Sequence, residues 1–420
     1  MDRGRLLILA DDLTGALDSG VQLAHRGQRV VILTAPDVPF PDSSVYDVLV
    51  IDTETRHIGA EEAGKLVFSL VRQAKASGIR CFYKKTDSGL RGKVGAELQA
   101  VLLASGAERL HFIPAYPATD RKTIGGIQYV NGKPLAESIF SKDPIDPIHV
   151  SGVDEVIHLS ADVPVKLCGA ATVKQDNDAC EFSGIIVHDA STMEDLAAIA
   201  ERLEKADELY VTGGCAGFLE VYPMEASRDT KEALPALKER LFVLSGSVND
   251  VTRKQLLYGE GHGAYRCHVP MAKILTGTWS DDEKKECLAK VQREAEGHDL
   301  VIVDTLGDEK LPEMEHPEVV TRNIADHMGR LSSFIKDGAR DFTFMIIGGD
   351  TLQGFIRDQG ITALKPVAEV APGVVLASYK KDGIKQYFIT KSGAFGDEGL
   401  LETVLTWLRK EFMKTVCSHR

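Results

Sequence analysis

Two adjacent aspartates, Asp11 and Asp12, directly follow an apolar run that predicts a buried strand in the segment LILADDLTGALDSG (7–20). Neighbouring carboxylates destabilise each other unless cations or hydrogen-bond donors face them, so their position favours a binding site. A plainer interpretation is that Asp12 or Thr14 caps the helix that follows. Ligands of parallel α/β sheets bind beyond the carboxyl ends of the strands, so partner groups are expected at neighbouring strand ends.

Three more polar clusters follow predicted strands in the first half of the chain. They are IDTETRH (51–57), YKKTDSGLRGKVGAEL (83–98) and PAYPATDRKTIGG (114–126), the last expected to be a long loop. Each cluster alone is most simply a solvated loop, but four at one sheet edge predict a pocket with both cations and carboxylates. Cations suit a ligand carboxylate, and aspartates accept hydrogen bonds from hydroxyls. The predicted ligand is therefore a small polyhydroxy acid.

The second half of the chain contains three strand-to-helix turns marked by glycine. They lie in FVLSGSVNDVTRKQL, FMIIGGDTLQGF and YFITKSGAFGDEGLL. Glycine lets the backbone approach a phosphate closely, and a helix N-terminus supplies N–H donors and partial positive charge. One such turn is weak evidence, but three in one domain predict a nucleotide site. The sequence GLRGKV (89–94) lacks the Walker spacing and hydroxyl, and no dinucleotide fingerprint follows the first strand.

The elements that must position these clusters alternate between short strands rich in Val, Ile and Leu and amphipathic helices. Helices are expected at 60–77, 280–297 and 317–338, among others. This alternation predicts two doubly wound α/β domains with mainly parallel sheets. The polar stretch 222–240 breaks the rhythm, so the domains are expected at 1–225 and 238–420, with an active-site cleft between them.

Composition narrows the functional class. A chain of 420 residues exceeds a single compact core, and a net charge of −13 argues against non-specific nucleic-acid binding. No apolar run approaches the roughly 18 residues of a membrane span. The seven cysteines are scattered without a C-x-x-C pair, which indicates reduced thiols and a cytoplasmic protein.

Taken as a set, these motifs resemble the four-carbon acid sugar kinases, and the resemblance extends over nearly the whole chain. It rests on ADDLTGALDSG, DTETR, YKKTDSGLRGKVGAEL, PAYPATDRKTIGGIQYVNGKPL, LSGSVNDVTRKQ, GGDT and TKSGAFGDEGLL. The resemblance implies an N-terminal domain that binds the sugar acid and a C-terminal domain that binds ATP. The KKTDS, LRG and NGKPL stretches are more similar to D-threonate and D-erythronate kinases than to 3-oxo-tetronate kinases.

The resemblance also implies site residues. The sugar-acid contacts would be Asp12, Arg56, Lys84, Lys85, Thr86 and Asp87, and the ATP contacts Ser247, Gly348, Gly349, Asp350, Thr351 and Gly393. Arg56, Lys84 and Lys85 would hold the substrate carboxylate. Asp87 or Asp12 would orient the attacking hydroxyl, and Asp350 would hold Mg²⁺ or act as base. Gly89 departs from the family pattern, in which a hydroxyl residue is common there.

The expected activity is therefore phosphorylation of the terminal hydroxyl of a four-carbon sugar acid by ATP with Mg²⁺, with a homodimer as the candidate assembly. Two alternatives stay open: a 3-oxo-tetronate 4-kinase, and a non-catalytic sensor of sugar acid and nucleotide. An aldolase or dehydrogenase acting on the same acids is a lesser rival. A sensor would need only the N-terminal cluster, whereas a kinase needs the glycine turns as well.

Overall fold

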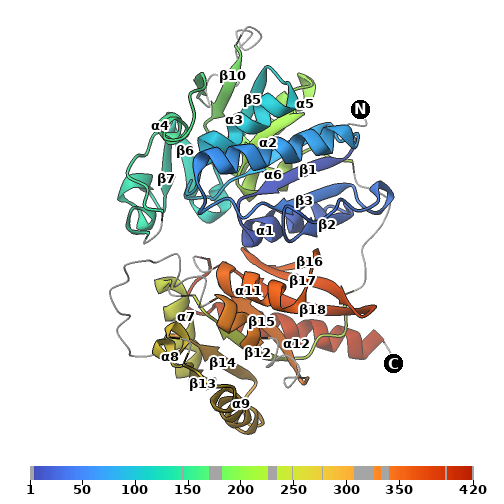
Figure 1. Cartoon of the computed structure of the whole chain (residues 1–420), viewed down its shortest axis with the longest axis vertical. Helices are drawn as coiled ribbons and strands as arrows, with labels where there is room; N and C mark the ends of the chain where they lie inside the picture. Colours follow the sequence, from blue (N-terminus) through green and yellow to red (C-terminus); the bar gives the residue numbers. More distant parts are fainter. Residues whose placement is uncertain are drawn as a thin grey trace. The chain divides into compact units, whose positions relative to one another are not determined.

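The computed structural model describes residues 4–143, 146–169, 182–225, 234–247, 249–276, 278–306, 325–332, 340–392 and 395–418. The chain divides into two compact units, Met1–Thr230 and Lys231–Arg420 (Figure 1). Each unit is built around a sheet covered by helices. The predicted α/β class with mainly parallel strands is confirmed.

The sheet of the first unit has the order β2-β3-β1-β4-β11-β5-β10-β9, with every neighbouring pair parallel. Its strands are β1 (Leu6–Ala10), β2 (Val30–Leu33), β3 (Val48–Asp52), β4 (Cys81–Lys85), β5 (Arg109–Ile113), β9 (Val165–Cys168), β10 (Gly184–His188) and β11 (Val211–Gly214). All five residues of β1 are buried. A strand covered on both faces reads as a continuous apolar run, which is why LLILA does not alternate with polar residues.

Helices cover both faces of this sheet. The helices α2 (Ala60–Ala76) and α3 (Val94–Ser105) lie side by side on one face, and α4 (Val153–His158) packs beside α3 (Figure 1). The helices α1 (Leu13–His25), α5 (Met193–Lys205) and α6 (Ala216–Val221) pack together on the other. Leu7 and Leu9 of β1 join the core under α2 and α3. The intervening residues of β1 face the opposite way, as the period of two requires.

The expectation of a long loop at 114–126 is wrong from Arg121 onwards. A small antiparallel sheet forms there from β6 (Arg121–Ile124), β7 (Ile127–Val130) and β8 (Lys133–Pro134). Gly125 and Gly126 join β6 to β7 with φ of +61° and +75°. Two consecutive residues with positive φ match the twist of a tight hairpin, which explains the glycine pair. Short 3₁₀ helices occur at η1 (Ser43–Val45), η2 (Pro117–Thr119), η3 (Leu135–Glu137) and η4 (Ile139–Lys142).

The sheet of the second unit has the order β13-β14-β12-β15-β18-β17-β16. Its strands are β12 (Arg240–Ser245), β13 (Tyr265–His268), β14 (Leu300–Asp304), β15 (Phe342–Ile347), β16 (Ala363–Ala371), β17 (Val374–Lys381) and β18 (Ile384–Lys391). The first five strands in this order run parallel, whereas β16, β17 and β18 form an antiparallel meander. Asp382 and Gly383 make its tight turn with φ of +51° and +79°.

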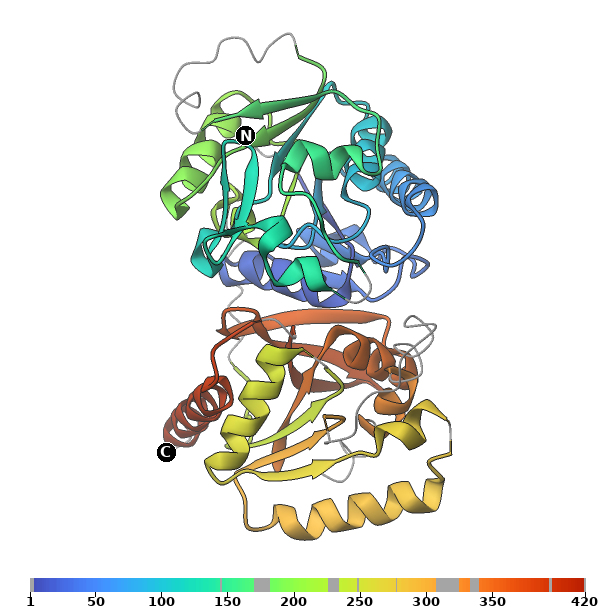
Figure 2. The same ribbon diagram turned by 90° about the vertical axis from the view of Figure 1, so that its left-hand side faces the viewer.

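In the second unit, α7 (Asp250–Gly261) and α12 (Leu400–Ser418) share one apolar core. On the other face, α11 (Gly349–Gln359) places Phe355 against Phe344, Tyr379 and Phe388. The remaining helices are α8 (Met271–Leu275) and α9 (Asp281–Ala295), and α9 is the long lower helix of Figure 2. The helix predicted at 317–338 is described only at 325–332, where it is helical, and the rest lies outside the described residues. No helix in the described ranges is long and apolar enough to cross a membrane.

Two buried histidines make the stability of the first unit sensitive to pH. The ring nitrogens His111 Nδ1 and His188 Nε2 lie 2.9 Å apart, and Arg202 and Glu208 flank the pair. Burial lowers the pKa of His111 and lowers that of His188 well below 6.5. The unfolded chain therefore binds protons that the folded chain does not, so this contribution to stability is complete above about pH 6.5 and is lost as pH falls. We expect urea unfolding at pH 5.5 to show a lower free energy than at pH 7.5.

The control for this prediction is the same measurement on two variants. His188→Gln should flatten the pH dependence, whereas His149→Gln, at an exposed position, should keep it. Equal pH dependence in all three proteins would contradict the assignment.

Candidate active site

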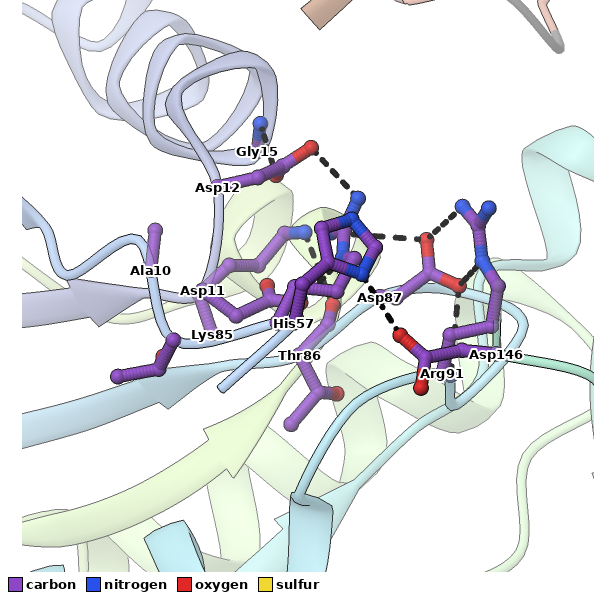
Figure 3. A network of polar contacts seen from close by, with 12 residues as sticks. Ala10, Asp11, Asp12, Gly15, His57, Lys85, Thr86, Asp87, Arg91 and Asp146 are labelled. Atoms are coloured by element: carbon purple, nitrogen blue, oxygen red, sulfur yellow. Dashed lines mark hydrogen bonds and ion pairs between the residues drawn. The ribbon is translucent and has the colours of Figure 1, made fainter. Parts of the chain in front are cut away.

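The carboxyl ends of β1, β3 and β4 meet at one edge of the first sheet. Ala10 pairs in register with Asp52 on one side and with Lys85 on the other. The residues after these three strand ends are therefore neighbours. The structure brings Asp12, Lys85 and Asp87 together there with Arg56. Figure 3 shows Asp12, Lys85 and Asp87 at this edge.

Arg56 is the centre of the cluster. Its Nε lies 2.7 Å from Asp11 Oδ2, its Nη1 2.7 Å from Asp12 Oδ2 and its Nη2 3.9 Å from Asp87 Oδ1. Burial alone would lower the pKa of Arg56, but Asp11 and Asp12 raise it well above its ordinary value. The guanidinium therefore stays charged and explains how the adjacent aspartates of the first strand end are tolerated.

Asp12 has two roles at once. Its Oδ1 accepts a hydrogen bond of 2.8 Å from Gly15 N, which caps α1, and its Oδ2 accepts one of 2.7 Å from Thr14 Oγ1. The same Oδ2 pairs with Arg56. Burial raises the pKa of Asp12, but Arg56 and Lys85 outweigh it and hold the pKa below its ordinary value. The cap interpretation and the site interpretation of Asp12 are therefore compatible.

The two lysines of β4 point to opposite faces. Lys84 is fully buried, with its Nζ 3.1 Å from Glu97 Oε1, and it donates to Leu9 O at 3.2 Å. Its ammonium ties α3 to the sheet and also donates to Lys85 O at 2.9 Å. Its contact with a substrate carboxylate stays a prediction. Lys85 lies on the cluster's side: a Cβ on Gly15 would stand 3.1 Å from Lys85 Nζ and 2.6 Å from Asp12 Oδ1. This close approach favours glycine at position 15.

Asp87 is held by arginine on two sides. Arg91 Nε and Nη2 donate to its two oxygens at 2.8 and 3.0 Å, and Arg91 also donates to Asp143 at 2.8 Å. Burial would raise the pKa of Asp87, but Arg91 and Arg56 hold it far below its usual range. Asp87 is thus a permanent carboxylate that accepts hydrogen bonds but is a weak base. Neighbouring Thr86 is buried, and within the described ranges its Oγ1 has no hydrogen-bond partner.

Sequence reasoning missed an outer layer of this cluster that comes from Phe140, Asp143 and Asp146. Asp146 accepts from Lys93 Nζ at 3.2 Å and lies 2.8 Å from His57 Nδ1. The Phe140 ring lies under Arg91, with 5.0 Å from guanidinium carbon to ring centroid. A Cβ at Gly89 would stand 2.6 Å from that ring, so the position of Phe140 favours glycine there. No strand end or glycine pattern marks this segment in the sequence.

Asp52 is a further missed carboxyl at the same edge. It is buried, and its Oδ1 accepts from Glu54 N at 3.1 Å. Burial, with Glu54 and Asp12 nearby, raises its pKa well above the ordinary value. Its position as the last residue of β3, before Arg56, was the available signal.

In the second unit the glycine turns also converge at strand ends. Gly348, with φ +106°, donates its N–H to Lys391 O at 3.1 Å, and a Cβ there would stand 3.4 Å from Ser247. The turns after β12 and β15 and the end of β18 therefore meet. From this point α11 runs on through Gly349, an exposed Asp350 and a buried Thr351. Gly393 lies outside the described residues.

Lys391 was not anticipated, although it directly precedes the predicted Ser-Gly turn. It is buried, and its Nζ lies 3.4 Å from Thr252 Oγ1 in the first turn of α7. Burial lowers its pKa to about 7. Its ammonium can therefore add positive charge at the strand ends where the turns meet.

Both units of the chain match families of known proteins. The first matches the family described as "Sugar-binding N-terminal domain" over residues 6–222, and the second matches "Nucleotide-binding C-terminal domain" over residues 242–401. A crystal structure of a Salmonella typhimurium LT2 protein, 23% identical, covers 97% of this chain and 99% of its own with a TM-score of 0.76. That likeness shows a common fold.

Curated relatives carry names of sugar-acid kinases. A D-threonate kinase from Salmonella typhimurium is 29% identical, over 97% of this chain and 99% of its own. A D-erythronate kinase from Heliobacterium modesticaldum is 32% identical over 60% of this chain and 59% of its own. A 3-oxo-tetronate kinase from Brucella melitensis is 25% identical over 94% of this chain and 93% of its own. The resemblance found in the motifs is confirmed, and the chain belongs to the four-carbon acid sugar kinase family.

Proposed function

We propose that this protein transfers the terminal phosphoryl group of ATP to the terminal hydroxyl of a four-carbon sugar acid such as D-threonate or D-erythronate. The observation that carries the proposal is the cluster of Asp12, Lys85 and Asp87 around Arg56 at the carboxyl edge of the first sheet. Cations and permanent carboxylates in one place suit a ligand that carries a carboxylate and several hydroxyls. Residues 1–225 would bind the acid and residues 238–420 the nucleotide.

Within the cluster the roles divide by accessibility. Arg56 already pairs with two carboxylates, so Lys85 and the remaining face of Arg56 attract the substrate carboxylate. Lys84 supports the sheet from inside. Asp12 and Asp87 accept hydrogen bonds from hydroxyls, and Asp87 orients the attacking one. Phosphoryl transfer proceeds through a loose transition state, so positioning matters more than a strong base.

The nucleotide phosphates would lie at the N-terminus of α11 and against the neighbouring turns. Gly348 suits this role because it has no side chain. A Cβ at this position would lie 3.4 Å from Ser247, so glycine leaves that space to a phosphate. Gly349, Asp350 and Thr351 form the first turn of α11 and would contact the phosphates. Gly393, in the third glycine turn, would contact them as well. Mg²⁺ would neutralise phosphate charge when bound, with Asp350 as its protein carboxylate. In the described residues no group of three or more His, Cys, Asp or Glu forms a metal cage, which suits an ion held largely by phosphates and water.

Gly348→Ala tests the nucleotide assignment. An L side chain at φ +106° is strained by about 1–3 kcal/mol. If the turn relaxes away from the phosphates, the KM for ATP should rise about ten- to hundred-fold, with the KM for the acid nearly unchanged. Gly360→Ala is the matched control, because it also has positive φ (+63°) but lies at the other end of α11 with open space around it. A rise in the acid's KM with normal ATP affinity in Gly348→Ala would contradict the assignment.

The function itself is tested by ADP release in the presence of ATP, Mg²⁺ and one acid at a time: D-threonate, D-erythronate or a 3-oxo-tetronate. We expect release that depends on one of the first two acids. Preference for the 3-oxo acid would favour the alternative kinase, which the relative from Brucella melitensis represents. Binding of both ligands without turnover would favour a sensor.

A cytoplasmic location and a homodimeric assembly complete the proposal. The absence of a membrane-spanning helix in the described residues and the scattered cysteines support the location. Light scattering on the purified chain measures the assembly directly.

A further inference from the structure

Two cysteines face each other in the second unit. Cys267 lies on β13 and Cys287 on α9, with their Sγ atoms 3.9 Å apart and both residues half-buried. A disulfide requires about 2.05 Å between the sulfurs, so the two must approach further before they bond. The other cysteines whose side chains are described, Cys81, Cys168 and Cys215, are buried.

The surroundings make the two sulfurs chemically different. The hydrogen bond from the Cys287 thiol, together with Lys290 and His268, lowers the pKa of Cys267 to about 7, whereas the pKa of Cys287 is raised. A substantial share of Cys267 is therefore thiolate at neutral pH, while Cys287 remains a thiol. By contrast, burial raises the pKa of Cys215 to about 11. Thiolate character and access to solvent are what make a cysteine reactive, and Cys267 has both.

Regular elements hold the pair in place. Arg266, the neighbour of Cys267 on β13, donates to Asp304 on the adjacent strand at 2.8 Å and to Glu260 of α7 at 2.9 Å. Ser280 and Glu283 form a capping box at the start of α9. The two sulfurs therefore stay close because a strand and a capped helix fix their backbones.

We propose that Cys267 and Cys287 form a redox-sensitive dithiol that a hydroperoxide converts reversibly into an intramolecular disulfide. The Cys267 thiolate attacks a peroxide oxygen: an S–O bond forms, the O–O bond breaks, and the leaving hydroxide or alkoxide takes up a proton. The Cys287 thiol then loses its proton and attacks the Cys267 sulfur, forming the S–S bond and releasing water. The peroxide gains the two electrons that the two thiols lose, and an excess of a small thiol reverses the reaction.

The test is peptide mapping of the full-length protein after treatment with hydrogen peroxide and alkylation without reductant. We expect one linked pair of peptides containing Cys267 and Cys287, lacking two hydrogens and separated by dithiothreitol. Before oxidation, iodoacetamide at pH 7 should label Cys267 faster than Cys287. Cys267→Ser should leave Cys287 reduced, and Cys287→Ser should let Cys267 proceed to the sulfinic acid.

Three results would overturn the proposal. One is sulfinic acid at Cys267 of the unsubstituted protein while Cys287 is still alkylated, because no resolving thiol would then have acted. Another is oxidation of Cys287 at an undiminished rate in Cys267→Ser. The third is that both thiols remain reduced at peroxide concentrations that oxidise Cys267 in Cys287→Ser.

Discussion

Replacing Arg56 by alanine is expected to destabilise the first unit and to abolish turnover of the sugar acid. Its guanidinium is the partner of Asp11, whose side chain is only 1% exposed, and of Asp12. Removing one member of a buried ion pair leaves an uncompensated charge and costs about 3–5 kcal/mol. Urea unfolding measures the first effect, and steady-state kinetics at a temperature where the variant remains folded measures the second.

Arg56→Lys separates stability from binding. Lysine keeps the charge but lacks the planar fork that reaches two carboxylates. We expect Arg56→Lys to recover most of the stability. The KM for the acid should stay raised about ten- to hundred-fold, because a lost charge-assisted hydrogen bond costs roughly 1.5–3 kcal/mol. Arg29→Ala, which breaks an exposed pair with Asp47, should cost less than about 1 kcal/mol. Loss of ATP affinity with an unchanged KM for the acid would show that the cluster binds the other substrate.

Asp12→Asn is expected to lower kcat/KM for the acid about ten- to hundred-fold while the protein still folds, because Arg56 keeps its pairs with Asp11 and Asp87. Asparagine caps a helix about as well as aspartate, so the contact with Gly15 N survives. The charge that faces Arg56 and Lys85 is lost, and with it a charge-assisted contact worth roughly 1.5–3 kcal/mol.

The same substitution at another cap is the control. Asp42 caps η1 by accepting from Ser44 N at 2.8 Å, and Asp42→Asn should change neither activity nor melting. Full activity in Asp12→Asn would leave Asp12 as a helix cap and nothing more.

Much of the first cluster was predictable because its members stand immediately after buried strands. Asp12, Arg56 and Asp87 lie near one another because parallel strands end at one edge, whatever the details of packing. The strand-end rule does not tell the surroundings of Lys84 from those of Lys85. Adjacent residues of a strand point to opposite faces, and a sheet covered on both faces offers no polar alternation that tells one lysine from the other.

The outer residues were not predictable for a different reason. Asp143, Asp146 and Phe140 come from a segment of short 3₁₀ helices whose residues carry no period and no glycine signal. They reach Arg91, Lys93 and His57 only through tertiary packing. Similarly, the antiparallel pairing of β17 with β18 depends on a tight turn at Asp382-Gly383, and no helix lies between these strands to mark them in the sequence.

The most direct test of the central claim is ³¹P NMR of the reaction with ATP, Mg²⁺ and the acid that supports ADP release. We expect a new phosphomonoester resonance split into a triplet by two equivalent or nearly equivalent protons, because the phosphate joins a terminal CH₂–OH. A doublet would place the phosphate on a secondary hydroxyl, and inorganic phosphate alone would mean hydrolysis of ATP. Either result would contradict a kinase that acts on the terminal hydroxyl of a four-carbon sugar acid.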